Sequence, residues 1–185
     1  GGGIYLYNHT STDTMEAKLS NTVITGNNAT ELGGGFSVEA DSNAADSTAV
    51  TFNESCAVYD NTADSGADDF YKNGNSTVNA LPTAAQMSAA AKNAVISGWY
   101  KDEEGNRYSK DNASEYTPKD STTDALQLKA VKAAQYAVTF DWNDGSSRTE
   151  TVSALAGTAL GDQMPAAPTR SGYTFTGWTT QADGQ

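Results

Sequence analysis

The chain has 185 residues, with 23 acidic and 11 basic side chains and a formal net charge of −12 at pH 7. Nucleic acids and anionic bilayers are bound by clustered Lys and Arg, so this composition argues against both as partners. No segment approaches the roughly 20 consecutive apolar residues of a membrane-spanning helix. Residues 1–82 hold eleven acidic and two basic side chains, and all four prolines lie at or after Pro82, which predicts a domain boundary there.

Residues 1–82 contain short runs rich in β-forming residues, separated by Gly, Asn, Asp and Ser. Glycine clusters at 1–3 and 33–35 each precede such a run, and residues 66–71 form a degenerate third copy. A second alignment places residues 23–30 on residues 56–63 at an offset of 33, which pairs Asn28 with Asn61. A repeat of this length with several short strands predicts stacked rungs of a parallel β-helix.

Alternation within these runs predicts which side chains point inward. The expected inward pairs are Ile4 and Leu6, Val23 and Thr25, Phe36 and Val38, Val50 and Phe52, and Cys56 and Val58. Cys56 is the only cysteine in the chain, so no intrachain disulfide can form. We interpret Cys56 as a small buried hydrophobe rather than a reactive thiol.

The segment ITGNNATELGGGF, which begins at Ile24, resembles the repeats of polymorphic outer-membrane-type and related bacterial right-handed β-helix proteins. Those repeats follow the pattern GN-x-A-x-x-GGG-I/F. The resemblance implies that residues 1–82 are the last rungs of a parallel β-helix.

A short helix is predicted over residues 83–94. Thr83 and Gln86 have the spacing of a capping box, in which each side chain bonds the backbone N–H of the other residue. Met87, Ala91 and Ala94 then share one helical face. We expect this helix to link two domains and to cover the open end of the solenoid.

Two Gly-Trp boxes follow, at residues 96–105 and 175–184, and their Gly, Trp and final Gly share one offset of 79. In the first unit we predict a strand at 95–101, a return strand at 107–109, and a strand at 125–131 with Leu126, Leu128 and Ala130 inward. In the second unit we predict strands at 136–142, 150–154 and 172–178.

Trp99 and Trp178 are predicted to anchor the cores of these units rather than to form exposed ligand platforms. The expected packing partners of Trp178 are Val138, Phe140, Tyr173 and Phe175.

The string YAVTFDWNDG … MPAAPTRSGYTFTGWTTQADG resembles the Listeria–Bacteroides repeat, the B-repeat of internalin-type surface proteins. This implies a small β-grasp-like domain at 136–185, with a partial copy at 95–134. The second copy lacks the final strand of the repeat, so we expect it to be truncated at its C-terminus and marginally stable. The expected fold is therefore mostly β: the end of a parallel β-helix, one short helix, and small β-grasp-like units. We also expect the chain to be a piece of a longer protein.

Few residues offer catalytic or metal-binding chemistry. His9 is the only histidine, lies in a loop-like stretch and is expected at the surface. The remaining candidates, for acid–base work on sugars or for a loose calcium site, are carboxylates: Asp41, Asp46, Asp60, Asp64, Asp68 and Asp69. We interpret them as solvated turn residues and predict no catalytic, cofactor-binding or metal-binding residue.

These features favour a fragment of an extracellular bacterial cell-surface protein. Its expected role is a non-catalytic stalk or spacer that adheres to a glycan or host-surface component, with cell-wall attachment through sequence beyond the C-terminus. The alternative is the accessory C-terminal portion of an extracellular carbohydrate-active β-helix enzyme, a glycosidase or lyase. A third, weaker idea is that calcium stiffens the rungs.

Overall fold

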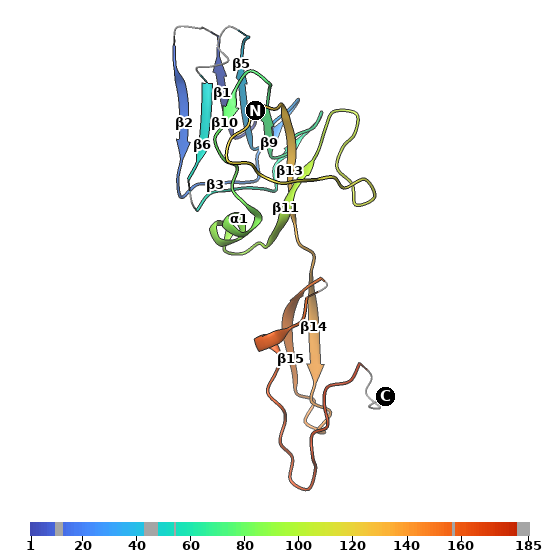
Figure 1. Cartoon of the computed structure of the whole chain (residues 1–185). Helices are drawn as coiled ribbons and strands as arrows, with labels where there is room; N and C mark the ends of the chain where they lie inside the picture. The colour runs from blue at the N-terminus through green and yellow to red at the C-terminus, as the bar shows by residue number, and fades with distance from the viewer. Residues whose placement is uncertain (10–12, 43–47, 54, 157, 181–185) are drawn as a thin grey trace. The chain divides into compact units, whose positions relative to one another are not determined.

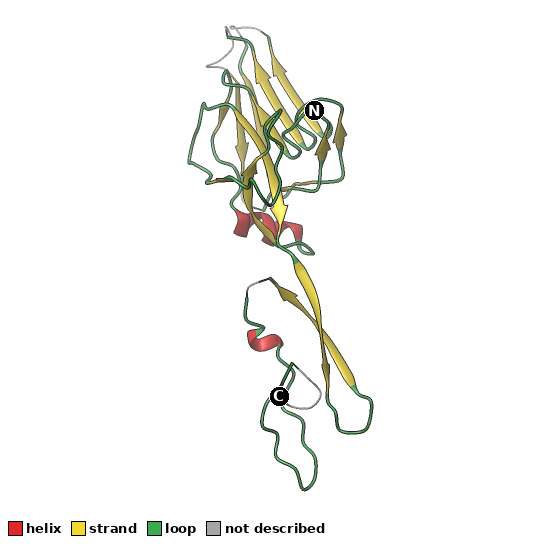
Figure 2. Cartoon of the chain, turned by 90° about the vertical axis from the view of Figure 1, so that its right-hand side faces the viewer, coloured by secondary structure: helices red, strands yellow, loops and turns green. Residues whose placement is uncertain are grey.

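The computed structural model describes residues 1–9, 13–42, 48–53, 55–156 and 158–180. The fold is mostly β with one short α-helix, as expected, and Figure 2 shows how far strands predominate. None of the helices in the described ranges is long and apolar enough to cross a membrane. The chain divides into two compact units, Gly1–Lys132 and Ala133–Gln185.

Successive segments of the first unit place their strands side by side in parallel (Figure 1). Strand β1 (Ile4–Asn8) pairs with β5 (Phe36–Ala40), and β5 pairs with β9 (Phe70–Lys72). The register sets Ile4 beside Phe36 and Phe36 beside Phe70. The predicted alignment of the two glycine clusters is thereby confirmed. The third copy at residues 66–71 is present too, but it stacks at an offset of 34, so Leu32 rather than Gly33 lies beside Gly66.

The other short strands follow the same order. In a three-stranded sheet, β6 (Thr48–Phe52) lies between β2 (Met15–Leu19) and β10 (Thr77–Val78), and both pairings are parallel. Two further parallel pairs join β3 (Val23–Ile24) to β7 (Ala57–Val58) and β4 (Asn28–Ala29) to β8 (Thr62–Ala63).

The predicted offset of 33 in this region is wrong by one residue. Val23 pairs with Ala57, an offset of 34, so Asn27 rather than Asn28 bonds to Asn61. A slip of one residue exchanges the two faces of a strand. Accordingly, Ile24 is buried and Val23 is 44% exposed, which reverses the predicted inward pair of Val23 and Thr25.

The glycine clusters allow the segments to approach closely. A Cβ atom on Gly34 would lie 2.2 Å from the Thr62 carbonyl oxygen and 2.4 Å from that of Asp68. A Cβ on Gly35 would lie 2.6 Å from the Asp69 carbonyl oxygen. Backbone atoms cannot yield to such overlaps, so glycine is required wherever another segment stacks in this way.

Helix α1 (Ala84–Ala91) begins at the predicted capping box. Gln86 N donates to Thr83 Oγ1 at 3.3 Å, and Thr83 N donates to Gln86 Oε1 at 2.9 Å. Met87 is fully buried, and the helix contacts β7 and β11. The predicted helix is therefore confirmed over this shorter span. Of its predicted face, Met87 is buried and Ala91 is partly buried against the core, whereas Ala94 lies beyond the end of the helix.

Antiparallel strands complete the larger sheet. Strand β13 (Leu126–Lys132) pairs with β9 on one side and with β11 (Ile96–Lys101) on the other, and β11 also pairs with β12 (Glu115–Tyr116). The sheet order is β1-β5-β9-β13-β11-β12. The predicted strands at 95–101 and 125–131 are confirmed, and Leu126, Leu128 and Ala130 are buried as expected.

The predicted return strand at 107–109 is wrong. These residues form no strand, because Tyr108 N donates to the Asp102 carboxylate and the Arg107 side chain turns back toward Asp68. The partner of β11 in their place is β12, several residues later.

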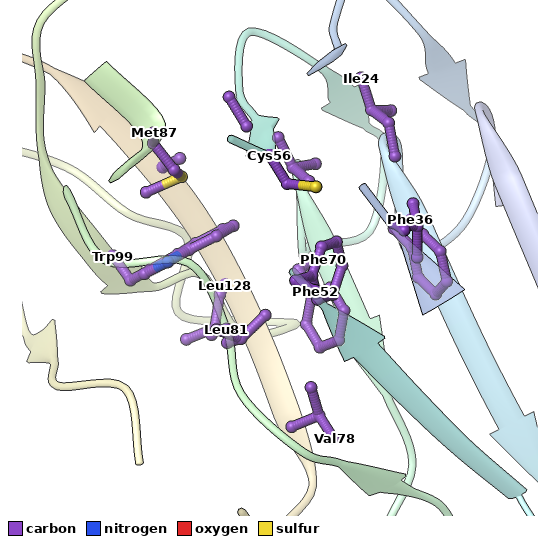
Figure 3. Packing of buried hydrophobic residues seen from close by; sticks show 14 of the residues in the cluster. Ile24, Phe36, Phe52, Cys56, Phe70, Val78, Leu81, Met87, Trp99 and Leu128 are labelled. Atoms are coloured by element: carbon purple, nitrogen blue, oxygen red, sulfur yellow. The ribbon is translucent and has the colours of Figure 1, made fainter. Parts of the chain in front are cut away.

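Aromatic rings join the segments in one core (Figure 3). Phe36, Phe52 and Phe70 have ring centroids 5.6–5.9 Å apart, and Trp99 meets Phe70 edge-on at 6.4 Å. Trp99 is 1% exposed, which confirms it as a core anchor, and Cys56 is a buried free cysteine as predicted.

The compact unit extends beyond the boundary predicted near Pro82. Residues 95–132 share both the sheet and the core of the first residues, so they do not form a separate compact body. Their origin as a partial copy of the repeat remains a prediction.

The second unit is a β-hairpin followed by extended chain. Strand β14 (Gln135–Asp141) pairs antiparallel with β15 (Thr149–Leu155), and a short 3₁₀ helix, η2, spans Gly161–Gln163. The first two predicted strands of this unit are confirmed. The third is wrong, since residues 171–180 contain no strand. The residue pattern predicted a strand there, but a strand also needs a partner strand whose backbone N–H and C=O groups it can bond.

Candidate functional site

The candidate carboxylates fall into two groups. Asp60 and Asp64 are exposed, Asp41 is partly exposed, and Asp46 lies outside the described residues. Asp68 and Asp69 are 5% and 0% exposed, so their interpretation as solvated turn residues is wrong. Both residues come just before β9 in the chain, and the backbone of Asp69 bonds to the neighbouring strand β13.

Asp68 belongs to an ionic cluster in which two buried carboxylates, Asp68 and Asp102, meet two partly exposed cations, Arg107 and Lys129. Arg107 donates from Nη2 to Asp68 Oδ1 at 2.5 Å and from Nε to Asp102 Oδ1 at 2.8 Å. Lys129 Nζ donates to the other Asp68 oxygen. Asp102 Oδ2 accepts from Asp68 N at 2.9 Å. The cluster therefore fastens residues 102–129 to the end of the stacked segments.

Burial alone would raise the pKa of Asp102. The hydrogen bonds from Arg107 and from the N–H groups of Asp68 and Tyr108 outweigh burial and hold this pKa below its usual value. The carboxylates of Asp68 and Asp102 are thus committed to cations and N–H donors of the protein itself, an arrangement suited to structure rather than to proton transfer.

Asp69 ends a ladder of asparagine side chains. Asn27 donates from N and Nδ2 to Asn61 Oδ1, and Asn61 donates from N and Nδ2 to Asp69 Oδ1, each bond being 2.9–3.0 Å long. Asp69 Oδ2 accepts from Ala130 N of β13 at 2.8 Å. Burial raises the pKa of Asp69 to about 6, although these hydrogen bonds and Lys129 oppose the shift.

The raised pKa of Asp69 makes stability depend on pH. The pKa of an aspartate in the unfolded chain is about 3.9, so the folded state favours the protonated form of Asp69. Above pH 6 Asp69 is ionised in both states, and the folded protein then bears the full free-energy cost of burying the charge. We expect the free energy of unfolding to rise by about 2 kcal/mol as pH falls from 7 to 4.5, because Asp69 then no longer has to ionise in the folded protein. Asp102, whose folded pKa is depressed, loses its contribution only at lower pH.

Urea unfolding at pH 4.5, 5.5 and 7 measures this effect. The Asp69→Asn variant, which cannot ionise, is the control and should show a flatter profile over the same range. An identical pH profile in both proteins would contradict the assignment.

A fully buried lysine fastens the same region. Lys72, at the end of β9, donates from Nζ to the carbonyl oxygens of Asn73 at 2.8 Å and Thr123 at 3.1 Å. Burial lowers the pKa of Lys72 to about 8. Its two carbonyl partners tie β9 to the loop that leads into β13.

The solvent face of β1 carries a row of aromatic rings. Tyr5 and Tyr7 are 52% and 42% exposed, and their ring centroids are 6.1 Å apart with planes 8° from parallel. The His9 ring continues the row at 6.1 Å from Tyr7. Residues two apart on a strand point to the same side, so the three rings share one face.

Asp41 holds part of this row in place. Its Oδ1 accepts from the Tyr7 hydroxyl at 3.1 Å, and its Oδ2 lies 2.6 Å from His9 Nδ1. The hydrogen bond to Asp41 raises the pKa of the Tyr7 phenol. His9 is exposed, as predicted, and its Nδ1 contacts the Asp41 carboxylate.

The neighbouring strands extend the row into a face. Ser37 and Glu39 of β5 lie in register beside Tyr5 and Tyr7, and Tyr71 of β9 lies beside Ser37. We call Tyr5, Tyr7, His9, Glu39, Asp41 and Tyr71 the aromatic face. Sugar rings pack their C–H groups on aromatic surfaces and bond their hydroxyls to carboxylates, and the aromatic face offers both kinds of group.

The aromatic face is not among the sites predicted above, although the sequence of β1 contains the signal for it. If Ile4 and Leu6 point inward, then Tyr5 and Tyr7 must point outward. Two exposed tyrosines on one strand are an unusual use of large aromatic side chains.

The second unit also gathers aromatic rings. Trp178 meets Phe140, Trp142 and Phe175 edge-on at 4.9–5.3 Å, beside an open hollow of about 850 Å³. Phe140 and Phe175 are thus confirmed as partners of Trp178. Tyr173 is 69% exposed instead, and the Arg170 guanidinium lies over its ring.

Residues 136–185 match the family model of the Listeria-Bacteroides repeat domain. The match confirms the resemblance seen in the sequence, and this repeat is typical of bacterial surface proteins. It covers nearly all of the second unit, including the β-hairpin and the rings around Trp178. No curated protein and no solved structure matches the chain.

Proposed function

We propose that the chain is part of an extracellular bacterial cell-surface protein, and that it acts as a non-catalytic stalk or spacer that binds glycans through the aromatic face. The Listeria-Bacteroides repeat supports the surface location. The observation that carries glycan binding is the exposed row of the nearly parallel Tyr5 and Tyr7 rings, continued by His9.

The stalk role rests on the proposed architecture of the first unit, the end of a parallel β-helix. Its support is the parallel pairing of strands 32–34 residues apart in four sheets. Each segment repeats the path of the preceding one, and β13 then adds to the last segment in the antiparallel sense. Such stacking extends in one dimension and suits a spacer.

A non-catalytic role is supported by the hydrogen bonds that the carboxylates of Asp68, Asp69 and Asp102 accept from other groups of the protein. In the alternative, where this chain is the accessory portion of a carbohydrate-active enzyme, the aromatic face would hold the glycan for a catalytic domain elsewhere. Both proposals require the face to bind sugar.

A glycan array probed with the full chain tests the proposal. We expect at least one class of glycan to bind, and the Tyr5→Ala/Tyr7→Ala variant to bind it at least about tenfold more weakly, because each aromatic contact contributes on the order of 1 kcal/mol. The control is Tyr136→Ala, which removes a tyrosine that is 59% exposed in the second unit. Absence of binding, or equal binding by the double variant, would refute the proposal.

A further inference from the structure

The aromatic face contains a carboxylate that no basic group neutralises. Glu39 is partly exposed on β5, in register with Tyr7. In the part of the chain that the structure describes, no Lys, Arg or His forms an ion pair with it. Asp41, by contrast, is already engaged by His9 and Tyr7.

Three phenol rings lie on the two strands that flank this charge, Tyr5 and Tyr7 on β1 and Tyr71 on β9. The pKa of Tyr5 and that of Tyr71 are raised first by burial and then by the negative charge of Glu39, and Glu39 also adds to the raised pKa of Tyr7. One carboxylate thus acts on all three rings of the face. Residues 1–82, with a net charge of −9, add to the negative potential.

Aromatic rings and an unpaired carboxylate together form the chemistry that recognises an organic cation. The faces of the rings attract a positive charge through their quadrupoles, and the carboxylate adds a direct ionic partner. Sulfated, sialylated or uronic acid-rich glycans would bring a second negative charge to Glu39 and be repelled.

We infer that the ligand of the aromatic face carries ammonium groups, and that its class is a linear glycan of amino sugars with free, unacetylated amines. The inference rests on the proposed glycan-binding function and specifies its substrate. The ammonium group lies against Glu39, while Tyr5 and Tyr7 pack on the sugar rings.

Two oligosaccharides that differ only in acetylation provide the test: a glucosamine oligomer and an N-acetylglucosamine oligomer of the same length. Each is titrated calorimetrically into the full chain near pH 6, where the free amines carry charge. We expect the glucosamine oligomer to bind at least about tenfold more tightly, since a cation–π contact and an ion pair each contribute about 1 kcal/mol.

Two charge-removing variants separate a specific contact from general attraction to an acidic protein. Glu39→Gln should abolish the preference for the glucosamine oligomer, whereas Glu150→Gln, an exposed residue of β15, should retain it. Circular dichroism of both variants checks that they fold.

The outcomes distinguish the inference from the proposal beneath it. Equal affinity for the two oligomers, or tighter binding of the acetylated one, overturns the inference and leaves glycan binding standing. Equal losses in Glu39→Gln and Glu150→Gln also overturn it. Binding of neither oligomer overturns the inference, and a glycan array without any signal would in addition refute glycan binding.

Discussion

Replacing Trp99 with alanine is expected to lower the free energy of unfolding of the first unit by about 3–5 kcal/mol. Trp99 is 1% exposed, and its ring packs edge-on against Phe70 in the core. Its Nε1 also donates to the Pro82 carbonyl oxygen at 2.8 Å, so the variant loses a buried hydrogen bond as well as apolar contacts.

Urea unfolding followed by far-ultraviolet circular dichroism measures the loss. Trp178→Ala is the matched comparison, because Trp178 is only partly buried and belongs to the other compact unit. It should leave the transition of the first unit unchanged. Equal effects of the two substitutions on that transition would contradict the role of Trp99 as its core anchor.

Asp102→Ala is the second substitution with a large expected effect, about 2–4 kcal/mol. Asp102 is 1% exposed and accepts hydrogen bonds from Arg107 Nε, Tyr108 N and Asp68 N. Its removal leaves three donors without their acceptor and weakens the hold of Arg107 on Asp68. The N–H groups of Asp68 and Tyr108 then lack an acceptor, which costs about 1–3 kcal/mol for each buried group, whereas the Arg107 side chain is 38% exposed and can bond to water instead.

The control for Asp102→Ala is Asp124→Ala, which removes an exposed carboxylate paired with Lys119 at 2.8 Å. Surface ion pairs contribute little, so we expect no measurable change in its unfolding midpoint. Hydrogen exchange at β13 should accelerate in Asp102→Ala alone. A midpoint for Asp102→Ala within error of the unsubstituted protein would show that the ionic cluster does not fasten residues 102–129.

The sequence predicted the elements of the fold better than their register. The glycine clusters placed Phe36 over Ile4, and the Thr83–Gln86 pair marked the start of α1. The offset in the asparagine region was missed because two asparagines adjoin, so either Asn27 or Asn28 can be aligned with Asn61. Only the hydrogen bonds of the folded chain distinguish the two.

The burial of Asp68 and Asp69 could not be predicted from local sequence. Aspartates that closely follow a glycine are common in turns, and the residues around Asp68 and Asp69 give no sign of a partner. The groups that compensate their charge and hydrogen bonding come from Arg107, Lys129 and Ala130, 39 to 61 residues later in the chain. The exposed tyrosines of the aromatic face, in contrast, could have been predicted from the sequence, because side chains alternate between the two faces of β1 and Ile4 and Leu6 point inward.

The pair Asp68–Asp69 sets a limit on how this protein can lengthen. It occupies the positions that Gly34 and Gly35 hold one segment earlier, where any side chain would collide with a following segment. Tandem duplication of the 34-residue unit can therefore add copies without steric clash only before Gly66. The two carboxylates mark the last copy, and further copies can be added on one side of them alone.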